Sequence, residues 1–252
     1  ASEIRAGPCV IGGFKLVSVI TVSYNAVSVI ERTILSVIGQ NYLNLEYIII
    51  DGGSVDGTID IIKNYQDQIS YWISESDGGI YDAMNKGLLQ SKGKWINFMN
   101  AGDTFSDMFV LDNIFSEEIN ENVGIVYGNT ALFKNGVFVE SFENKPFWLS
   151  LMPFRGKGIC HQSMFVKSDL AKRMMFDTSY RICSDYDMCY KIYKKGYEFL
   201  FVDIVVSHYD VTGVSCNNPM LALEENARIL KCRNNILYML FYFYCWLKNK
   251  RQ

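Results

Sequence analysis

The sequence lacks the patterns that identify disulfide-bonded, metal-binding and nucleic-acid-binding proteins. Its seven cysteines form no Cys-x-x-Cys pair and no metal-ligand spacing. An odd, scattered set of this kind is typical of reduced thiols in a cytoplasmic protein. The net charge of −3 and the pI of about 5.5 argue against a broad surface for nucleic acid. We therefore expect a cytoplasmic protein with no nucleic-acid partner.

Signals for nucleotide cofactors and for export are missing as well. Neither of the first two strand-like runs is followed by Gly-x-Gly-x-x-Gly, which argues against a dinucleotide-binding oxidoreductase. The segment Tyr24–Ser28 is neither glycine-rich nor basic, as a nucleotidyltransferase would require. Ala1–Gly13 is short, mixed and glycine-bearing, unlike a signal peptide. We expect residues 1–14 to form a leader outside the fold.

What the chain does contain is a regular alternation of strand-like and helix-like segments. Buried strands are expected at 16–23, 46–50, 69–75 and 94–99, with helices at 29–38, 57–65 and 79–90. This order predicts an α/β fold with parallel strands. Farther along we expect a helix at 107–117, a hairpin of 123–133 with 137–142, loops over 145–165, helices at 168–173 and 184–195, and a strand at 198–206. At 252 residues, one domain is favoured over two.

The run Tyr47–Ile50 ends in a carboxylate, two glycines and a serine, within Asp51–Thr58. An acid at the carboxyl end of a buried parallel strand lies where open α/β sheets bind ligands, and glycines there allow a flat ring to approach the backbone. A carboxylate suits an N–H donor such as a uracil imide. A turn in which Asp51 only bonds its own loop is the alternative.

The preceding strand, Leu16–Asn25, also ends in polar and aromatic residues. Two adjacent strand ends that offer an aromatic ring and an acid form a slot for a nucleotide base. In this interpretation Tyr24 stacks on the base and Asp51 accepts from its edge.

At this point the motifs resemble a known family. Val19–Asn25, Asp51–Thr58, Ser74–Gly87 and Phe98–Asp103 are similar, as an ordered set, to family 2 glycosyltransferases of the GT-A fold. The resemblance covers about residues 15–216 and is strongest to bacterial enzymes of exopolysaccharide and O-antigen assembly, of the colanic acid type. It implies a Rossmann-like half with a mixed central sheet and a smaller acceptor-binding part.

The resemblance also implies a division of the chain and a reaction. Residues 15–103 would bind the nucleotide sugar, 104–216 the acceptor, and 217–252 would form a helical tail. The reaction would be inverting transfer of a hexose or N-acetylhexosamine to a growing, lipid-linked polysaccharide. UDP is the favoured carrier, with dTDP as the alternative because it shares the imide edge. A catalytically inactive nucleotide-sugar-binding relative is the rival interpretation.

The same resemblance places a set of residues at the nucleotide sugar: Thr21, Ser23, Tyr24, Asn25, Asp51, Asp77 and Asn85. Asp77 would lie near the base and ribose. Ala83 and Gly87, four residues apart, would let their helix pack closely on the sheet. Two roles are possible for Lys86: it contacts a phosphate, or it is an ordinary solvated lysine on the helix.

Asn100–Asp103 occupies the position where family members bind a divalent metal. The motif usually presents two or three carboxylates, but here Asn100 replaces the leading acid and only Asp103 is acidic. Mn²⁺ and Mg²⁺ both favour such oxygen ligands. We expect a metal on Asp103, held less strongly because one charge is lost.

Asp185, in the segment Cys183–Asp187, matches the family's catalytic acid. Inverting transfer needs one general base to take the proton of the acceptor hydroxyl. Residues two apart on a helix point in different directions, so only one of the two acids can face the cleft. We expect this to be Asp185, with Asp187 as a neighbouring acid that does not contact the ligand. Capping of the helix is the alternative for either acid.

Two further segments match the family near the acceptor. His161 and Gln162 would bind the acceptor sugar or hold their loop to the helix of Asp185, and a core histidine is the alternative. His208 is interpreted as structural. Thr212–Ser215 is similar to a mobile loop that closes over the diphosphate, with Ser215 as a contact.

The segment Ile236–Leu247 is unusually apolar and aromatic. As a helix it is about 18 Å long, too short to cross a bilayer. Basic residues flank it: Arg228, Lys231, Arg233, Lys248, Lys250 and Arg251. This pattern favours an interfacial helix on the cytoplasmic face of the inner membrane, near a polyprenyl-diphosphate-linked or oligosaccharide acceptor. Packing on the core and a dimer contact are the alternatives.

Overall fold

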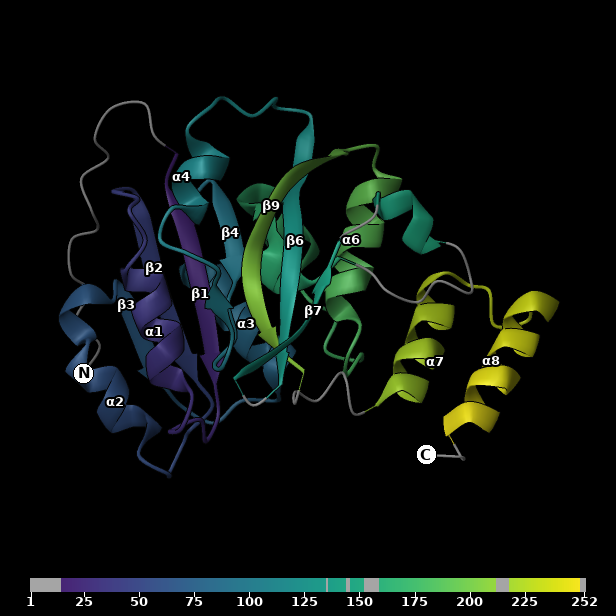
Figure 1. Ribbon diagram of the computed structural model, residues 1–252, viewed down its shortest axis with the longest axis horizontal. Helices are drawn as coiled ribbons and strands as arrows, with labels where there is room; N and C mark the ends of the chain where they lie inside the picture. Colours follow the sequence, from purple (N-terminus) through teal and green to yellow (C-terminus); the bar gives the residue numbers. More distant parts are fainter. Residues whose placement is uncertain (1–14, 135, 144–145, 152–158, 212–217, 250–252) are drawn as a thin grey trace.

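The computed structural model describes residues 15–134, 136–143, 146–151, 159–211 and 218–249. A mixed sheet runs through the molecule in the order β3-β2-β1-β4-β8-β6-β9-β5, with β7 paired to β6 (Figure 1). The strands are β1 (Val17–Ser23), β2 (Leu45–Asp51), β3 (Tyr71–Ser74), β4 (Trp95–Phe98), β5 (Thr104–Phe105), β6 (Val123–Lys134), β7 (Val137–Phe142), β8 (Met164–Lys167) and β9 (Glu198–Asp210). The α/β class, the mixed sheet and the β6–β7 hairpin predicted from the sequence are confirmed.

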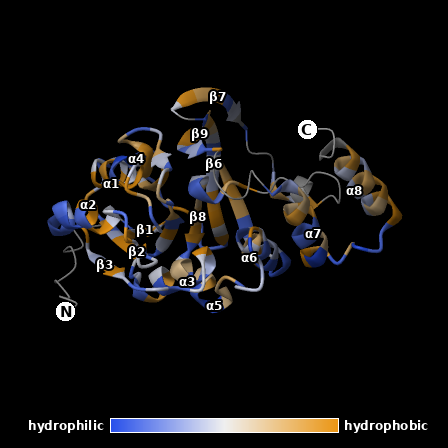
Figure 2. Cartoon of the chain, turned by 90° about the horizontal axis from the view of Figure 1, so that it is seen from below, coloured by the Kyte–Doolittle hydropathy of each residue, from blue (hydrophilic) through white to orange (hydrophobic). Residues whose placement is uncertain are grey.

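Helices cover both faces of this sheet (Figure 2). They are α1 (Ile30–Ile38), α2 (Thr58–Asn64), α3 (Ile80–Gln90), α4 (Val110–Phe115), α5 (Ser168–Met174), α6 (Ser184–Lys194), α7 (Pro219–Ile229) and α8 (Ile236–Asn249). Apolar side chains of α1, α2 and α4 form one core layer, and those of α3, α5 and α6 form the other. The sheet is thus fixed on both sides by packed helices.

The first four strands are parallel, and their register sets the position of their polar ends. Ser23 is paired with Asp51, and Asp51 is paired with Ser74. Because β1, β2 and β3 end level with one another, these three polar residues meet at one edge of the sheet.

Helix α3 lies closely against this part of the sheet, as its small residues predict. A Cβ at Gly87 would lie 2.5 Å from Ile20 Cγ2 on β1. Any larger residue there would push α3 away from β1 and β2. The close packing holds the N-terminal end of α3 near the carboxyl ends of those strands.

Strand β8 is a difference from the sequence-based expectation, which placed a loop through residue 165. Met164–Lys167 pairs antiparallel with β4 and with β6 and so joins the two halves of the sheet. It is only four residues long and runs directly into α5, so hydrophobic periodicity cannot separate it from its neighbours. Strand β5 was missed for the same reason of length, and β9 extends four residues beyond its predicted end.

Helices α7 and α8 extend from the body of the protein beside α6 (Figure 1). Ile229 of α7 is buried in the same core layer as α6, so α7 packs as part of the domain. Helix α8 contacts α7 through Tyr238, which is 5 % exposed. Within the described ranges, no helix has the length and apolar character needed to cross a membrane.

Candidate active site

Asp51 is the centre of a closed hydrogen-bond network at the end of β2. Its carboxylate accepts five hydrogen bonds, from Ser23 Oγ, Ser54 Oγ, Ser74 Oγ and the amides of Gly53 and Ser54, at 2.5 to 3.1 Å. The side chain is fully buried. Burial alone would raise the pKa of Asp51, but the serine and backbone donors together outweigh burial and lower this pKa below its ordinary value.

This geometry differs from the one expected for a contact between Asp51 and a nucleotide base. A buried carboxylate with five donors has neither an exposed face nor a free position for a base N–H. Asp51 instead fixes the loop that follows β2, including Gly53, whose φ of +83° favours glycine. The turn interpretation considered for this segment is the one that the contacts support.

Tyr24 and Asp77 lie together over Gly52, next to this network. A Cβ at Gly52 would come within 2.7 Å of Asp77 Oδ2 and 3.4 Å of Tyr24 Cδ2. The Tyr24 ring is 68 % exposed, so one of its faces is open to a planar ligand. The glycine thus leaves room for an aromatic ring and a carboxylate from two different strand ends to lie over the backbone.

The other predicted nucleotide residues have structural partners. Thr21 lies inside β1, fully buried, with Oγ1 3.0 Å from the Tyr47 hydroxyl. Ser23 donates to Asp51. The Asn85 amide is bonded at both ends to the backbone of Phe176.

Asn25 and Lys86 are more exposed. Asn25 adopts a left-handed conformation, with φ of 47°, and its Oδ1 accepts from the amide of Val55. The Lys86 ammonium pairs with Glu75 at 2.8 Å, which favours the interpretation of an ordinary helix lysine.

Asp103 is the second buried carboxylate at the sheet edge. Its oxygens accept from the amide of Asp210 at 3.0 Å and from Gln162 Nε2 at 2.7 Å. Burial raises the pKa of Asp103 to about 6, and these two donors only partly offset the effect of burial. The side chain therefore holds β4, β9 and the segment of Gln162 together.

As arranged, the residues around Asp103 do not fit a divalent ion. Mg²⁺ and Mn²⁺ need several oxygen ligands, but both Asp103 oxygens already accept from nitrogen donors. Asn100 directs its Nδ2 to His161, which leaves its Oδ1 as one oxygen without a partner among the described residues and short of the several that these ions need. In the part of the chain that the structure describes, no group of three or more His, Cys, Asp or Glu side chains could hold a metal. The metal site predicted on Asp103 is not formed by these contacts.

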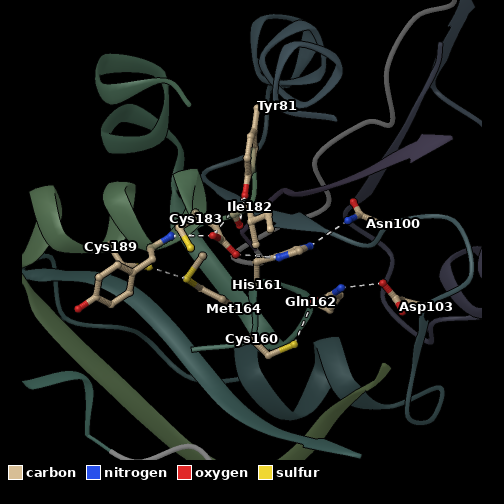
Figure 3. Close-up of polar contacts among 12 residues, drawn as sticks. Tyr81, Asn100, Asp103, Cys160, His161, Gln162, Met164, Ile182, Cys183 and Cys189 are labelled. Carbon is tan, nitrogen blue, oxygen red and sulfur yellow. Dashed lines mark hydrogen bonds and ion pairs between the residues drawn. The ribbon is translucent and has the colours of Figure 1, made fainter. Parts of the chain in front are cut away.

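Hydrogen bonds join three side chains next to Asp103, namely Asn100, His161 and Asp185; Figure 3 labels the first two. Asn100 Nδ2 lies 3.0 Å from His161 Nε2, and His161 Nδ1 lies 3.0 Å from Asp185 Oδ2. When the Asn100 amide donates to Nε2, the imidazole proton is on Nδ1 and is donated to Asp185. His161 thus links the end of β4 to the start of α6, as one of the sequence-based interpretations expected.

Asp185 is held but not enclosed. Its Oδ1 accepts from the amide of Tyr186 at 2.8 Å, and its side chain is 19 % exposed. Asp187 is buried and pairs with Lys191 at 2.6 Å, away from His161. Only one of the two acids is therefore available to a ligand, as the helical spacing predicted.

Two residues of this site were not predicted from the sequence. The Tyr81 hydroxyl, at the start of α3, donates to the carbonyl of Ile182 and lies 3.5 Å from Asp185 Oδ1 (Figure 3). Glu225 on α7 accepts from the three amides that precede α6. Tyr81 lies within a motif that matches the family, but from the sequence alone an aromatic residue at this helix position indicates a core side chain. Glu225 lies in a helix of polar and apolar residues, where an acidic residue normally indicates the face exposed to solvent, so no sequence pattern places it at the site.

Two remaining predictions have different outcomes. The Thr212–Ser215 loop, with Ser215, lies outside the described residues. His208 packs on Phe133, with ring centroids 4.7 Å apart, and burial lowers its pKa. This agrees with a structural role.

Comparisons with a family model and with known sequences agree on one family. The model for glycosyl transferase family 2 matches residues 18–182. An uncharacterized glycosyltransferase of Mycobacterium tuberculosis is 32 % identical over 216 residues, covering 84 % of this chain and 81 % of that protein. A PGL/p-HBAD biosynthesis glycosyltransferase of Mycobacterium bovis is 26 % identical over 204 residues, covering 78 % of this chain and 77 % of that protein.

Solved structures show the same fold. Staphylococcus aureus TarS in complex with UDP-GlcNAc aligns with a TM-score of 0.65 at 16 % identity, over 90 % of this chain and 72 % of that chain. The mannosyltransferase PcManGT of Pyrobaculum calidifontis, in complex with GDP-Man and Mn²⁺, aligns with a TM-score of 0.65 at 19 % identity, over 91 % and 66 %. In another TarS structure the chain spans 64 % of the solved length. At these identities the likeness concerns the GT-A fold alone.

Proposed function

The chain belongs to glycosyl transferase family 2, and from this membership we propose that it transfers a sugar from a nucleotide sugar to a hydroxyl of a glycan or glycolipid, with Asp185 as general base. The observation that carries the proposal is the environment of Asp185. It is a partly exposed carboxylate held through both oxygens, by His161 and by the amide of Tyr186. A positioned carboxylate of this kind is what proton abstraction from a hydroxyl requires.

In the proposed reaction, Asp185 takes the proton of the acceptor hydroxyl as its oxygen attacks the anomeric carbon. The bond from that carbon to the diphosphate oxygen breaks on the opposite face, so the nucleoside diphosphate leaves and the configuration inverts. No covalent enzyme intermediate is needed. His161 keeps the carboxylate oriented by donating from Nδ1, while Asn100 fixes which ring nitrogen carries the proton.

We propose a UDP-sugar that carries a hexose or N-acetylhexosamine as the donor. Support comes from the open ring of Tyr24 next to Asp77 and Gly52, and from the UDP and UDP-GlcNAc complexes of the structural neighbour TarS. The base would stack on Tyr24, and Asp77 would accept from the base or ribose. Asp51 would act indirectly, because it fixes the loop on which Gly52 lies.

A divalent metal remains a separate prediction. PcManGT was solved with Mn²⁺, but here Asp103 could offer an oxygen to a metal only by releasing Gln162 or the amide of Asp210. No step of the proposed reaction depends on the ion. Activity that is unchanged by EDTA and by added Mn²⁺ would remove the metal from the proposal.

We propose a lipid-linked acceptor, such as a polyprenyl-diphosphate glycan, at the cytoplasmic face of the inner membrane. The PGL/p-HBAD biosynthesis relative supports a glycolipid product. Helix α8 is largely apolar (Figure 2). It supports peripheral contact because large apolar residues are exposed along it: Ile236, Leu237, Met239, Leu240, Phe243, Tyr244, Trp246 and Leu247. Exposed Lys231 and Arg233 precede it and suit an anionic surface.

Vesicle co-sedimentation tests the membrane contact. Replacing Leu240 and Phe243 by serine should abolish binding to vesicles that contain phosphatidylglycerol and leave turnover with a water-soluble acceptor unchanged. Equal sedimentation of the variant and the wild type would rule out α8 as the membrane contact.

The catalytic proposal is tested with the full chain and a panel of UDP-glucose, UDP-galactose, UDP-GlcNAc and GDP-mannose. Release of the nucleoside diphosphate is measured with p-nitrophenyl glycosides as soluble acceptors. Asp185→Asn should lower kcat by about 100-fold or more, while nucleotide affinity stays within about twofold. Undiminished turnover would remove Asp185 from the role of base. Binding of one nucleotide sugar without turnover by the wild type would favour the inactive homologue.

A further inference from the structure

The segment that leads into α6 has no side chain of its own to cap the helix. The amides before and within the first turn of a helix lack partners inside the helix. Cys183 is the N-cap of α6, and its side chain makes no capping hydrogen bond. The catalytic candidate Asp185 follows two residues later, so the direction of its carboxylate depends on how this segment is held.

Glu225, on a different helix, supplies acceptors to the amides of the segment that precedes α6. Its Oε1 accepts from the amide of Arg181 at 2.7 Å, and its Oε2 accepts from the amides of Ile182 at 3.0 Å and Cys183 at 2.9 Å. The Glu225 side chain is buried, at 7 % exposure. A buried carboxylate with three amide donors is a strong and directional contact, and it fixes three consecutive peptide units.

Other residues of α7 hold the same segment. Arg228 Nη2 donates to Ser179 Oγ at 2.9 Å, and its guanidinium lies 4.5 Å from the centre of the Tyr180 ring. Ala222, Glu225 and Arg228 are spaced three residues apart and lie on one face of α7. The Ala222 carbonyl accepts from the Cys183 thiol. One helix face therefore contacts residues 179 to 183 along their length.

The opposite side of this segment is held by Tyr81 on α3. Its hydroxyl donates to the Ile182 carbonyl, so residue 182 is bonded through its amide to Glu225 and through its carbonyl to Tyr81. The same hydroxyl lies 3.5 Å from Asp185 Oδ1. The entrance to α6 is thus fixed between a helix of the nucleotide half and a helix beyond residue 216.

We propose that Glu225 is a positioning residue for Asp185, an inference that rests on the proposed role of Asp185 as base. Glu225 acts through the backbone of residues 181 to 183 and touches neither substrate nor the reacting atoms. It sets the orientation of the first turn of α6, and with it the direction in which the Asp185 carboxylate meets the acceptor hydroxyl. Undocking of α7 would then release residues 181 to 183 and change the direction of the first turn of α6.

The first test measures the contact itself. In the wild-type full chain, the amide hydrogens of residues 181 to 183 should exchange slowly with deuterium. Glu225→Gln, which keeps the size and offers one oxygen in place of two, should increase their exchange at least tenfold. Glu224→Gln, on the exposed side of the same helix, is the matched control and should leave exchange unchanged. Equal protection in all three proteins would overturn the inference.

The second test measures catalysis with the donor and acceptor that turn over best in the panel. Glu225→Gln should lower kcat by about 10- to 100-fold, because misplacement of a catalytic group by about 1 Å has effects of this size. The KM for the donor should stay within about twofold, and Glu225→Asp should recover part of kcat. A parallel fall in kcat and donor affinity would indicate a general structural role and contradict the inference.

Asp185→Asn is measured beside these variants to separate the two proposals. If Asp185→Asn is inactive and Glu225→Gln has wild-type kcat, the positioning role is wrong and the base assignment stands. If Asp185→Asn retains full activity, the base assignment fails and the positioning role fails with it. Loss of activity in both variants, with donor binding retained, supports both.

Discussion

Asp51 and Asp103 are both buried at the carboxyl ends of central strands, but their surroundings affect ionisation in opposite directions. Asp51 accepts five hydrogen bonds, and its pKa lies below the ordinary value. Asp103 accepts two through its carboxylate, and burial raises its pKa to about 6. The number of donors, and not burial alone, decides which form of a buried acid the fold stabilises.

This difference separates the two halves of the site. The Asp51 loop is a closed structural unit that presents Gly52 to Tyr24 and Asp77. The Asp103 region is less completely satisfied, since the buried Oδ1 of nearby Asn100 has no hydrogen-bond partner among the described residues. The Asp51 loop is therefore held by internal hydrogen bonds, whereas the Asp103 region contains one acceptor, Asn100 Oδ1, that a ligand could bind.

The largest effect on stability is expected from Asp51→Asn. The amide keeps one acceptor oxygen but turns an NH₂ group toward buried donors, and each unsatisfied donor costs about 1–3 kcal/mol. We expect the free energy of unfolding to fall by about 3 kcal/mol in urea denaturation. Asp60→Asn, at an exposed position on α2, is the control and should change it by less than about 0.5 kcal/mol. Equal stability of the two variants would show that the Asp51 network contributes little.

An effect of intermediate size on the free energy of unfolding is expected from the titration of Asp103. Its pKa is about 6 in the folded state and about 3.9 when unfolded. Between these values the folded state binds more protons, so stability falls as pH rises, by about 1.4 kcal/mol per pH unit. The contribution is fully present below pH about 4 and lost above pH about 6.

Asp103→Asn does not titrate and isolates this effect. In urea denaturation with EDTA present, the wild type should lose stability relative to the variant between pH 4.5 and 6. For Asp51 we expect the opposite dependence of the free energy of unfolding on pH, because its lowered pKa means that its stabilising contribution is lost as pH falls through that pKa. Parallel curves for the wild type and Asp103→Asn would mean that Asp103 titrates near its ordinary value.

The smallest effect on stability is expected from Tyr24→Ala. The ring is 68 % exposed, so the free energy of unfolding should change by less than about 0.5 kcal/mol. Base stacking on an aromatic ring contributes about 1–3 kcal/mol, so affinity for UDP should fall about tenfold in calorimetric titration. Tyr24→Phe should bind like the wild type. Unchanged affinity of Tyr24→Ala would exclude the stacking role.

Local patterns in the sequence predict the first half of the fold well. Apolar runs of strand length alternate with helical periodicity from residue 16 to residue 99, and polar residues mark the strand ends. The partners of Asp51 were not predictable in the same way. Ser23 and Ser74 meet it only because three strands share one register, and no local pattern specifies that register.

The candidate base and its histidine were identified from motifs, but the residues that hold them were not. Tyr81 is 101 residues from Ile182 in sequence, and Glu225 is 42 residues from Cys183. Such contacts arise from helix packing and leave no spacing signal. The buried state of Asp103 and Thr21 also depends on neighbouring elements, so it could not be inferred from the strand in which each residue lies.

The Glu225 contact has a consequence for how this domain can be divided. The family model matches residues 18–182, and the last family motif identified in the sequence ends at Ser215, yet an acceptor for the amide at the start of α6 comes from residue 225. A truncation after residue 216 would keep all the recognisable motifs and lose that acceptor. With Glu225 in the proposed positioning role, the smallest portion to exchange between related enzymes or to express alone with full activity extends at least through α7. The end of the family match, at residue 182, and the end of α7, at residue 229, are more than 40 residues apart.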